Sequence, residues 1–149
     1  MRVLLDTNIL TRSAQPAHSM YAEAVDAVSA LRTGGDELCI VPQNLIEFWA
    51  VATRPLSVNG LEMTTARAQI ELAHIKSFFR YLPDTPSVYD EWERLVTSHG
   101  VSGRNSYDAR LAAAMIVHGI THLLTFNVSD FKRYSEVTVI SPSEMIQNG

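Results

Sequence analysis

The chain has 149 residues, the size of one domain, and its hydrophobic content of 46% is sufficient for a packed core. The longest uninterrupted apolar run, Leu111 to Val117, is far too short to span a membrane, and the N-terminus lacks a signal-peptide pattern. We therefore expect a cytoplasmic protein with no membrane partner. A single cysteine, Cys39, excludes an internal disulfide and is expected to be a buried strand residue.

Taken alone, the formal net charge of −4 argues against a nucleic-acid partner. Four of the acidic residues, however, are candidate metal ligands, as argued below. The other twelve acidic residues equal the twelve Lys and Arg residues, so the rest of the chain is neutral. Bound divalent cations would offset the charge of the four, and net charge therefore excludes neither RNA nor DNA as a partner.

Hydrophobic spacing and turn residues predict alternating strands and helices along the first half of the chain. The expected elements are a strand at 2–5, a loop at 6–8, a helix at 18–32, a strand at 37–41 and a helix from Pro42 to Ala52. The loop is expected because Asp, Thr and Asn side chains favour turns after a strand.

The second half continues the alternation. Its expected elements are a helix from Thr64 to about Phe79, a brief strand at 80–82, helices at 86–99 and from Asn105 or Ser106 to Gly119, strands at 122–125 and 137–140, and a short helix from Ser141. This order predicts an α/β fold, a three-layer sandwich with a central, mostly parallel sheet flanked by helices, in one domain over 1–149.

Four carboxylates stand where these elements end or begin. Asp6 follows the first strand, Glu47 lies in the helix after the second, Asp108 heads the helix that ends at Gly119, and Asp130 follows the strand at 122–125. Because ligands of open parallel sheets bind beyond the carboxyl ends of the strands, we expect all four on one rim. Converging carboxylates bind hard divalent cations, and such a cation can activate a water to hydrolyse a phosphodiester.

Each carboxylate also has an ordinary structural explanation. Asp6 and Asp130 suit Asx turns, Asp108 suits the first turn of a helix, and Glu47 suits one exposed position on an otherwise apolar helix. For Asp108 this explanation is opposed by its position, because it shares a helical face with the apolar residues three, four and seven positions later. A carboxylate on that face points inward and needs a partner.

Other polar residues are candidates for supporting roles. Neutral oxygen-bearing side chains lie beside the carboxylates at Thr7, Asn8, Thr125 and Asn127. They suit contacts to the carboxylates or to phosphate, although turn formation explains them nearly as well. Cations for RNA binding are scattered at Arg12, Arg54, Arg104, Arg110, Lys132 and Arg133. Arg104, beside Gly103, is the first choice as a substrate contact, because it is a loop cation near the expected rim. The five histidines lack a paired zinc-ligand spacing.

At this point the sequence resembles the PIN-domain nucleases, in particular the VapC-like ribonuclease toxins of bacterial toxin–antitoxin modules. The resemblance extends over nearly the whole chain and is carried by four segments, at 4–8, 44–47, 107–113 and 124–131. It implies that Asp6, Glu47, Asp108 and Asp130 are catalytic and bind Mg²⁺ or Mn²⁺, with help from Asn8, Thr125 or Asn127. It further implies endoribonuclease activity, homodimers and a cognate antitoxin that covers the site.

Electrostatics agrees with a metal site. Two unit charges about 4 Å apart repel by roughly 4 kcal/mol at an effective dielectric of about 20, so at least one carboxylate is expected to have a raised pKa without a cation. Three alternatives remain: a PIN scaffold that binds RNA or a partner without cleaving, a receiver-like signalling domain with an acidic Mg²⁺ pocket, and an aspartate-phosphorylating phosphatase. The phosphatase needs a second Asp where Asn8 stands, and the receiver needs a well-placed lysine.

Overall fold

In the computed structural model, which describes residues 1–148, five parallel strands form one sheet in the order β3-β2-β1-β4-β5. The strands are β1 (Arg2–Leu5), β2 (Glu37–Ile40), β3 (Arg80–Tyr81), β4 (His122–Leu124) and β5 (Thr138–Ile140). The helices are α1 (Thr7–Ser13), α2 (Tyr21–Thr33), α3 (Pro42–Thr53), α4 (Thr65–Phe78), α5 (Pro86–His99), α6 (Asn105–His118) and α7 (Pro142–Asn148), with 3-10 turns η1 (Leu56–Val58) and η2 (Val128–Phe131). The predicted α/β sandwich is confirmed.

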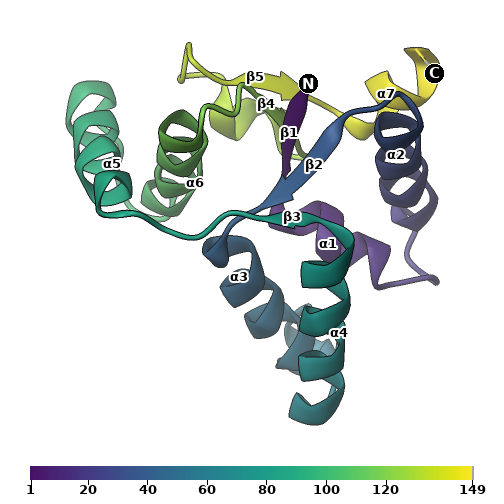
Figure 1. Ribbon diagram of the computed structural model, residues 1–149. Coiled ribbons are helices and arrows are strands. Elements are labelled where there is room, and N and C mark those ends of the chain that lie inside the picture. Colours follow the sequence, from purple (N-terminus) through teal and green to yellow (C-terminus); the bar gives the residue numbers. More distant parts are fainter. Residues whose placement is uncertain (149) are drawn as a thin grey trace.

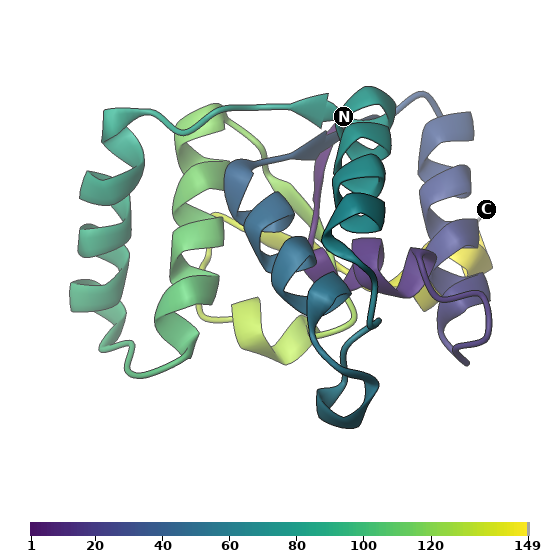
Figure 2. The ribbon, with the colours of Figure 1, turned by 90° about the horizontal axis from the view of Figure 1, so that it is seen from below.

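Helices cover both faces of the sheet. Figure 1 shows α5 and α6 on one side of the central strands, and α2 and α7 on the other. Figure 2 shows α5 and α6 lying side by side, joined through Gly100, which ends α5 with a φ of 60°. The remaining helices α1, α3 and α4 pack below the sheet in the view of Figure 1.

Alternating side chains divide the core into two parts. Leu4 of β1, together with its register partners Cys39 and Leu123, packs against α5 and α6. Val3 and Leu5, on the opposite face, pack with apolar residues of α1 to α4. The strands therefore read as continuous apolar runs because both of their faces are covered. Cys39 is fully buried, as predicted.

The loop predicted at 6–8 is wrong, because α1 begins at Thr7. The Asp6 carboxylate accepts the Thr7 backbone N–H at 2.7 Å and so caps the helix. Ile9 and Leu10 give this short helix a buried apolar side, which contributes more stability than turn preference alone. The helix expected from His18 begins at Tyr21. Within residues 1–148, none of the helices is long and apolar enough to cross a bilayer.

Candidate active site

Asp6 lies between β1 and α1, and its carboxylate is held by two donors. Its Oδ1 accepts the Thr7 backbone N–H, and its Oδ2 accepts the Thr125 hydroxyl at 2.7 Å. Thr125 is fully buried and follows β4, the strand paired with β1. Burial raises the pKa of Asp6, the two donated hydrogen bonds oppose this, and the charge of Asp130 adds to it. Asp6 is thus fixed at the carboxyl end of the two strands.

A network of neutral side chains surrounds Asp6. The Asn8 side-chain amide lies 3.3 Å from the Thr125 hydroxyl oxygen and 3.5 Å from Asp6 Oδ2. The Asn8 Oδ1 accepts the Phe126 backbone N–H at 3.4 Å, and the Thr125 hydroxyl oxygen accepts the Asn127 backbone N–H at 2.9 Å. The predicted supporting residues therefore connect the loop after β4 to the start of α1.

Glu47 is carried by α3, whose start is attached to β1 by Asn44. The Asn44 Oδ1 accepts the Val41 backbone N–H at 2.9 Å, and its amide donates to the Leu5 carbonyl at 2.9 Å. Asn44 is completely buried, so these bonds are shielded from water. Burial is the main reason why the pKa of Glu47 is raised, and the charge of Asp6 raises it further.

Asp108 lies half-buried in the first turn of α6 and is affected by the charges of the three other carboxylates. Burial, followed by the charges of Asp6, Asp130 and Glu47, raises its pKa from 3.8 to about 6. Arg133 opposes this shift. The residues behind it on the same face, Leu111, Ala112 and Met115, are buried as the sequence predicted. The charges of the three other predicted carboxylates therefore all act on Asp108.

Three of the four carboxylates line one polar cavity of about 670 Å³. Asp6 contributes from the end of β1, Glu47 from α3 and Asp108 from α6. Asp130 lies in η2 and does not line this cavity, although its charge acts on Asp6 and Asp108. Further polar residues on the walls are Thr7, Asn8, Thr11, Gln15, His18, Asn59 and Asn127.

The donor set fits a hydrated hard cation. Within the part of the chain that the structure describes, no three His, Cys, Asp or Glu side chains stand close enough to enclose a metal by themselves. Mg²⁺ does not require such a cage, because it keeps several waters and binds one or two carboxylates together with substrate phosphates. The cavity supplies carboxylate oxygens and room for waters. Its chemistry suits Mg²⁺ or Mn²⁺ better than zinc, which prefers nitrogen and sulfur ligands.

The cations on the cavity wall are not the one that the sequence favoured. Arg104 is exposed and does not line the cavity, whereas Arg12 and Arg54 do. Asn44 was missed as an organising residue. The sequence contains one feature that could have identified Asn44. It is the third residue of a helix that starts with Pro42, and a side-chain amide at that position can hydrogen-bond to the backbone just before the helix.

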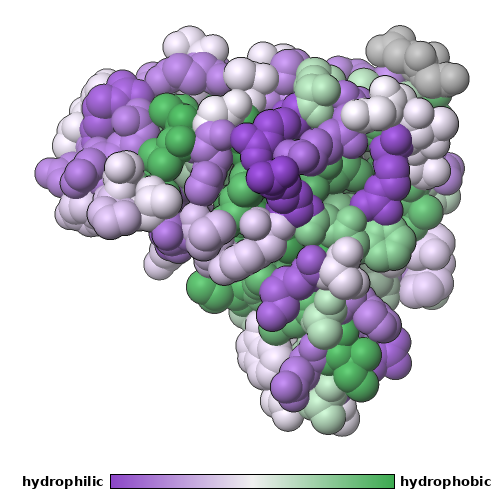
Figure 3. Space-filling model, in the orientation of Figure 1, coloured by the Kyte–Doolittle hydropathy of each residue, from purple (hydrophilic) through white to green (hydrophobic). Residues whose placement is uncertain are grey.

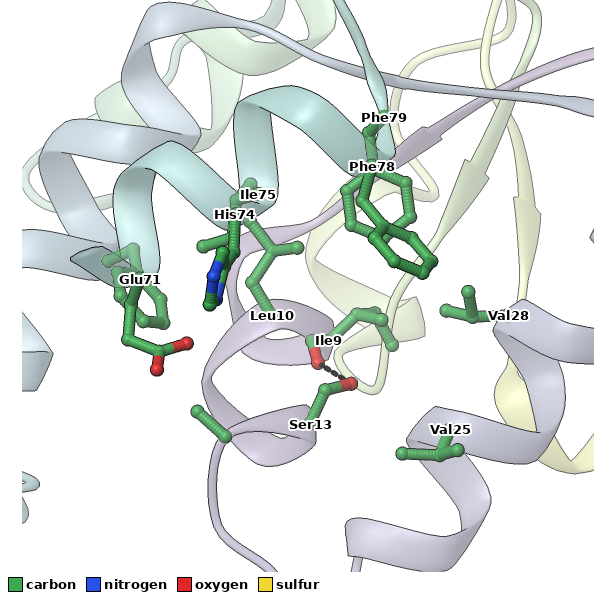
Figure 4. Close-up of a pocket in the computed structure, with 12 residues that line it drawn as sticks. Ile9, Leu10, Ser13, Val25, Val28, Glu71, His74, Ile75, Phe78 and Phe79 are labelled. Atoms are coloured by element: carbon green, nitrogen blue, oxygen red, sulfur yellow. Dashed lines mark hydrogen bonds between the residues drawn. The ribbon is translucent and has the colours of Figure 1, made fainter. Parts of the chain in front are cut away.

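A second cavity, of about 350 Å³, is mainly apolar and lies between α1, α2 and α4. We call it the apolar groove, and its apolar walls are Ile9, Leu10, Ala14, Val25, Val28, Phe48, Ile75, Phe78 and Phe79. Figure 3 shows apolar surface over the region between α2 and α4. Figure 4 shows the rings of Phe78, the last residue of α4, and of Phe79, directly after it, facing Val25 and Val28 on α2. Phe78 is 63% exposed, which is unusual for a large aromatic residue.

Comparisons with known proteins agree with this architecture. No curated protein matches the sequence at a significant level. Solved structures of similar fold include VapBC2 from Rickettsia felis bound to a DNA fragment from their promoter, with a TM-score of 0.67, 18% identity and coverage of 95% of this chain and 98% of that one. FitAcB from Neisseria gonorrhoeae has a TM-score of 0.64 and 18% identity, with coverage of 95% and 98%.

A third similar structure is VapC20 from Mycobacterium tuberculosis, described as a toxin that cleaves the sarcin–ricin loop. Its TM-score is 0.66 at 16% identity, with coverage of 91% of this chain and 98% of that one. Identities this low establish a shared fold only. The model of the PIN domain family, in contrast, matches residues 3–137. This match spans β1 to the residue before β5, including all four carboxylates, and the chain therefore belongs to the PIN domain family.

Proposed function

We propose that the protein is a Mg²⁺- or Mn²⁺-dependent endoribonuclease and the toxin of a toxin–antitoxin pair. The observation that carries the proposal is that Asp6, Glu47 and Asp108 come from three separate elements to one cavity, where burial and the charges of the other carboxylates raise the pKa of Asp108. Their mutual repulsion is unfavourable unless a cation offsets it. When bound, the cation would lower the pKa of a coordinated water and neutralise charge on the phosphate.

The side chains then have distinct tasks. We assign Asp6 and Asp108 to the principal cation, because Asp6 is fixed by two hydrogen bonds and Asp108 is coupled to every other carboxylate. Glu47 has a raised pKa and lines the same cavity, so it is suited to accept a proton from the attacking water. Asp130 orients that water or contributes to a second cation. Asn127, on the cavity wall, is free to contact a phosphate oxygen.

The direct test is incubation of the purified protein with end-labelled RNA in Mg²⁺, in Mn²⁺ and in excess chelator. We expect internal cleavage that requires the metal and that is abolished in Asp108→Asn. Asp90→Asn is the matched control, since Asp90 is an exposed acid on α5 that lines none of the cavities described above. Cleavage that persists in chelator, or in Asp108→Asn, would contradict the proposed chemistry.

The main alternative is a PIN scaffold that binds RNA or a protein without cutting. It predicts metal-dependent RNA binding with no product under any of these conditions. The receiver-like alternative predicts covalent labelling by acetyl phosphate. It is disfavoured because neither lysine of the chain, Lys76 or Lys132, lines the cavity.

The apolar groove is the proposed binding site for a segment of the antitoxin. Several structural relatives were solved as toxin–antitoxin complexes, which supports a protein partner of this kind. An amphipathic helix is the partner that fits, because its apolar side can cover Phe78 and Phe79 while its polar side stays in water. The candidate antitoxin is the product of a small neighbouring gene.

This part of the proposal is tested by co-purification with that product. Phe78→Asp is expected to weaken the complex, because an ionised carboxylate would have to be buried on binding. Ile70→Asp is the control, since Ile70 is also exposed on α4 but lies outside the groove. Equal binding by both variants would show that the antitoxin docks elsewhere. A homodimer is also proposed, and light scattering of the purified protein tests it.

A further inference from the structure

The polar cavity has a positively charged end that is distinct from its carboxylate end. Along α1 the wall continues from Asn8 to Arg12, and along α3 it continues from Glu47 to Arg54, the residue directly after the helix. The step of four residues keeps Asn8 and Arg12 on one side of α1, and Arg54 reaches the same cavity from the extended residue that ends α3. With a rise of about 1.5 Å per residue, the arginine end of α3 lies on the order of 10 Å from Glu47.

In the part of the chain that the structure describes, neither arginine is paired with an acid. Arg12 donates to the Gln15 side-chain carbonyl at 2.9 Å, and Arg54 donates to the Asn59 backbone carbonyl at 3.1 Å. Within residues 1–148, neither guanidinium forms a salt bridge, whereas Arg2, Arg67, Arg80, Arg94 and Arg110 all do. Neutral oxygen partners orient the two arginines and leave their full positive charge for an anion.

The loop after α3 is shaped to hold Arg54 in place. The Glu62 backbone N–H donates to the Arg54 carbonyl at 3.0 Å, which folds the loop back over the end of the helix. Gly60 lies against Arg54 so closely that an added Cβ would come within 1.9 Å of its carbonyl oxygen and 2.4 Å of its Cγ. Only glycine permits this approach, so the loop and Arg54 form one fixed wall of the cavity.

We infer that Arg12 and Arg54 form a second anion subsite, which binds an RNA phosphate on the nucleotide chain beside the phosphate that is cut. The inference rests on the proposed function, because it assumes that the carboxylate end receives the cut phosphate. A polyanion with regularly spaced phosphates matches a cavity that offers one cation-binding end and one arginine end. An acidic peptide has no comparable spacing, and it would place carboxylates beside Asp6 and Glu47.

The subsite explains how substrate length contributes to affinity. A dinucleotide has a single phosphodiester, which the carboxylate end would occupy with its cation. A longer single strand reaches both ends and gains the contacts of the arginines. We therefore expect an RNA hexanucleotide to bind more tightly than a dinucleotide, and the difference to depend on Arg12 and Arg54.

The experiment measures the anisotropy of fluorescent oligoribonucleotides with the Asp108→Asn protein, in which the RNA stays intact, at a Mg²⁺ concentration high enough to load its weakened cation site. Arg12→Gln and Arg54→Gln are each expected to weaken hexanucleotide binding by about tenfold, since a charge-assisted hydrogen bond is lost. Each should also make the plot of log binding constant against log salt concentration less steep by about 0.7. The double substitution should remove the advantage of the hexanucleotide over the dinucleotide.

Lys76→Gln is the matched control, because it removes one positive charge from the exposed side of α4, where Lys76 forms no salt bridge with the other residues that the structure describes. Arg104→Gln tests the cation that the sequence alone favours, and it should weaken binding less than Arg12→Gln. Gly60→Ala should reproduce the Arg54→Gln result by displacing Arg54. Circular dichroism checks that each variant is folded. If Arg54→Gln is unfolded, the binding of the two RNA lengths by Arg12→Gln tests the subsite.

The inference is overturned if the arginine variants bind both RNA lengths as the parent does, or if they lose affinity only for a polyglutamate peptide. Failure of the nuclease proposal gives a different pattern. In that case the wild-type protein leaves RNA uncut in Mg²⁺, while the arginine-dependent binding of the hexanucleotide persists.

Discussion

Replacing Asp108 by Asn tests the electrostatic account of the cavity with little other disturbance. Its carboxylate accepts no hydrogen bond from the residues that the structure describes, so the substitution removes charge without breaking a bond. Asp6 is less suitable, because its carboxylate caps α1 and accepts the Thr125 hydroxyl. An Asn at position 6 would change the charge and these contacts together.

The magnitude follows from the pKa. A rise from 3.8 to about 6 is roughly two units, which would correspond to about 3 kcal/mol for a fully shielded group. Asp108 is half-buried, so solvent screening reduces this to about 1–2 kcal/mol. For a domain of this size we expect the metal-free Asn variant to melt about 3–6 °C above the wild type near neutral pH.

The sign depends on pH in a defined way. The folded pKa of Asp108 lies above the unfolded value, so folding favours the protonated carboxyl. Its stabilising contribution is complete below about pH 4 and is lost as the pH rises through about 6. The advantage of the Asn variant should therefore be small near pH 4 and complete near pH 7.

Urea unfolding of both proteins in chelator, at about pH 4 and about pH 7, measures this difference. Asp90→Asn should leave stability unchanged at both values. Adding Mg²⁺ should reverse the order, because only the wild-type site binds the cation well and gains stability from it. The reasoning would be refuted if Asp108→Asn were less stable than the wild type in chelator at neutral pH. It would also be refuted if the gain in unfolding free energy were the same at both pH values.

Two further predictions concern the residues that hold the carboxylates in place. Asn44→Ala leaves the buried Leu5 carbonyl and Val41 N–H without their side-chain partner. It should therefore lower the free energy of unfolding, measured by urea titration, by about 3 kcal/mol. A loss below about 1 kcal/mol would contradict the role of Asn44. Thr125→Val removes a donor to the Asp6 carboxylate, which should raise the pKa of Asp6 further. The acidic limb of the cleavage pH profile should then move to higher pH, and an unmoved limb would show that this hydrogen bond does not tune the site.

Much of the fold follows from local pattern. The alternation of strands and helices predicted a sheet flanked by helices, and the spacing of Leu111, Ala112 and Met115 behind Asp108 predicted the buried face of α6. The family resemblance rested on segments that each surround one carboxylate. These features are local because they depend on side-chain periodicity and on residues that follow a strand within a few positions.

Other features depend on parts of the chain that are far apart. Turn preferences at 6–8 suggested a loop, but burial of Ile9 against α2 and α4 made this segment helical. The strand order places β4 beside β1, and this pairing brings Thr125 to Asp6. Neither outcome is decided by nearest neighbours in the sequence.

The sequence by itself determined the class of fold, the positions of the strands and the four acidic residues worth examining, because periodicity and turn chemistry are local properties. Only the tertiary structure decided which of these acids share a cavity, and that Arg12 and Arg54 complete its far end while Arg104 stays outside. The physical reason is that charge coupling and cavity walls depend on distances between separate elements. Those distances are set by the strand order and the packing of α1 against α3.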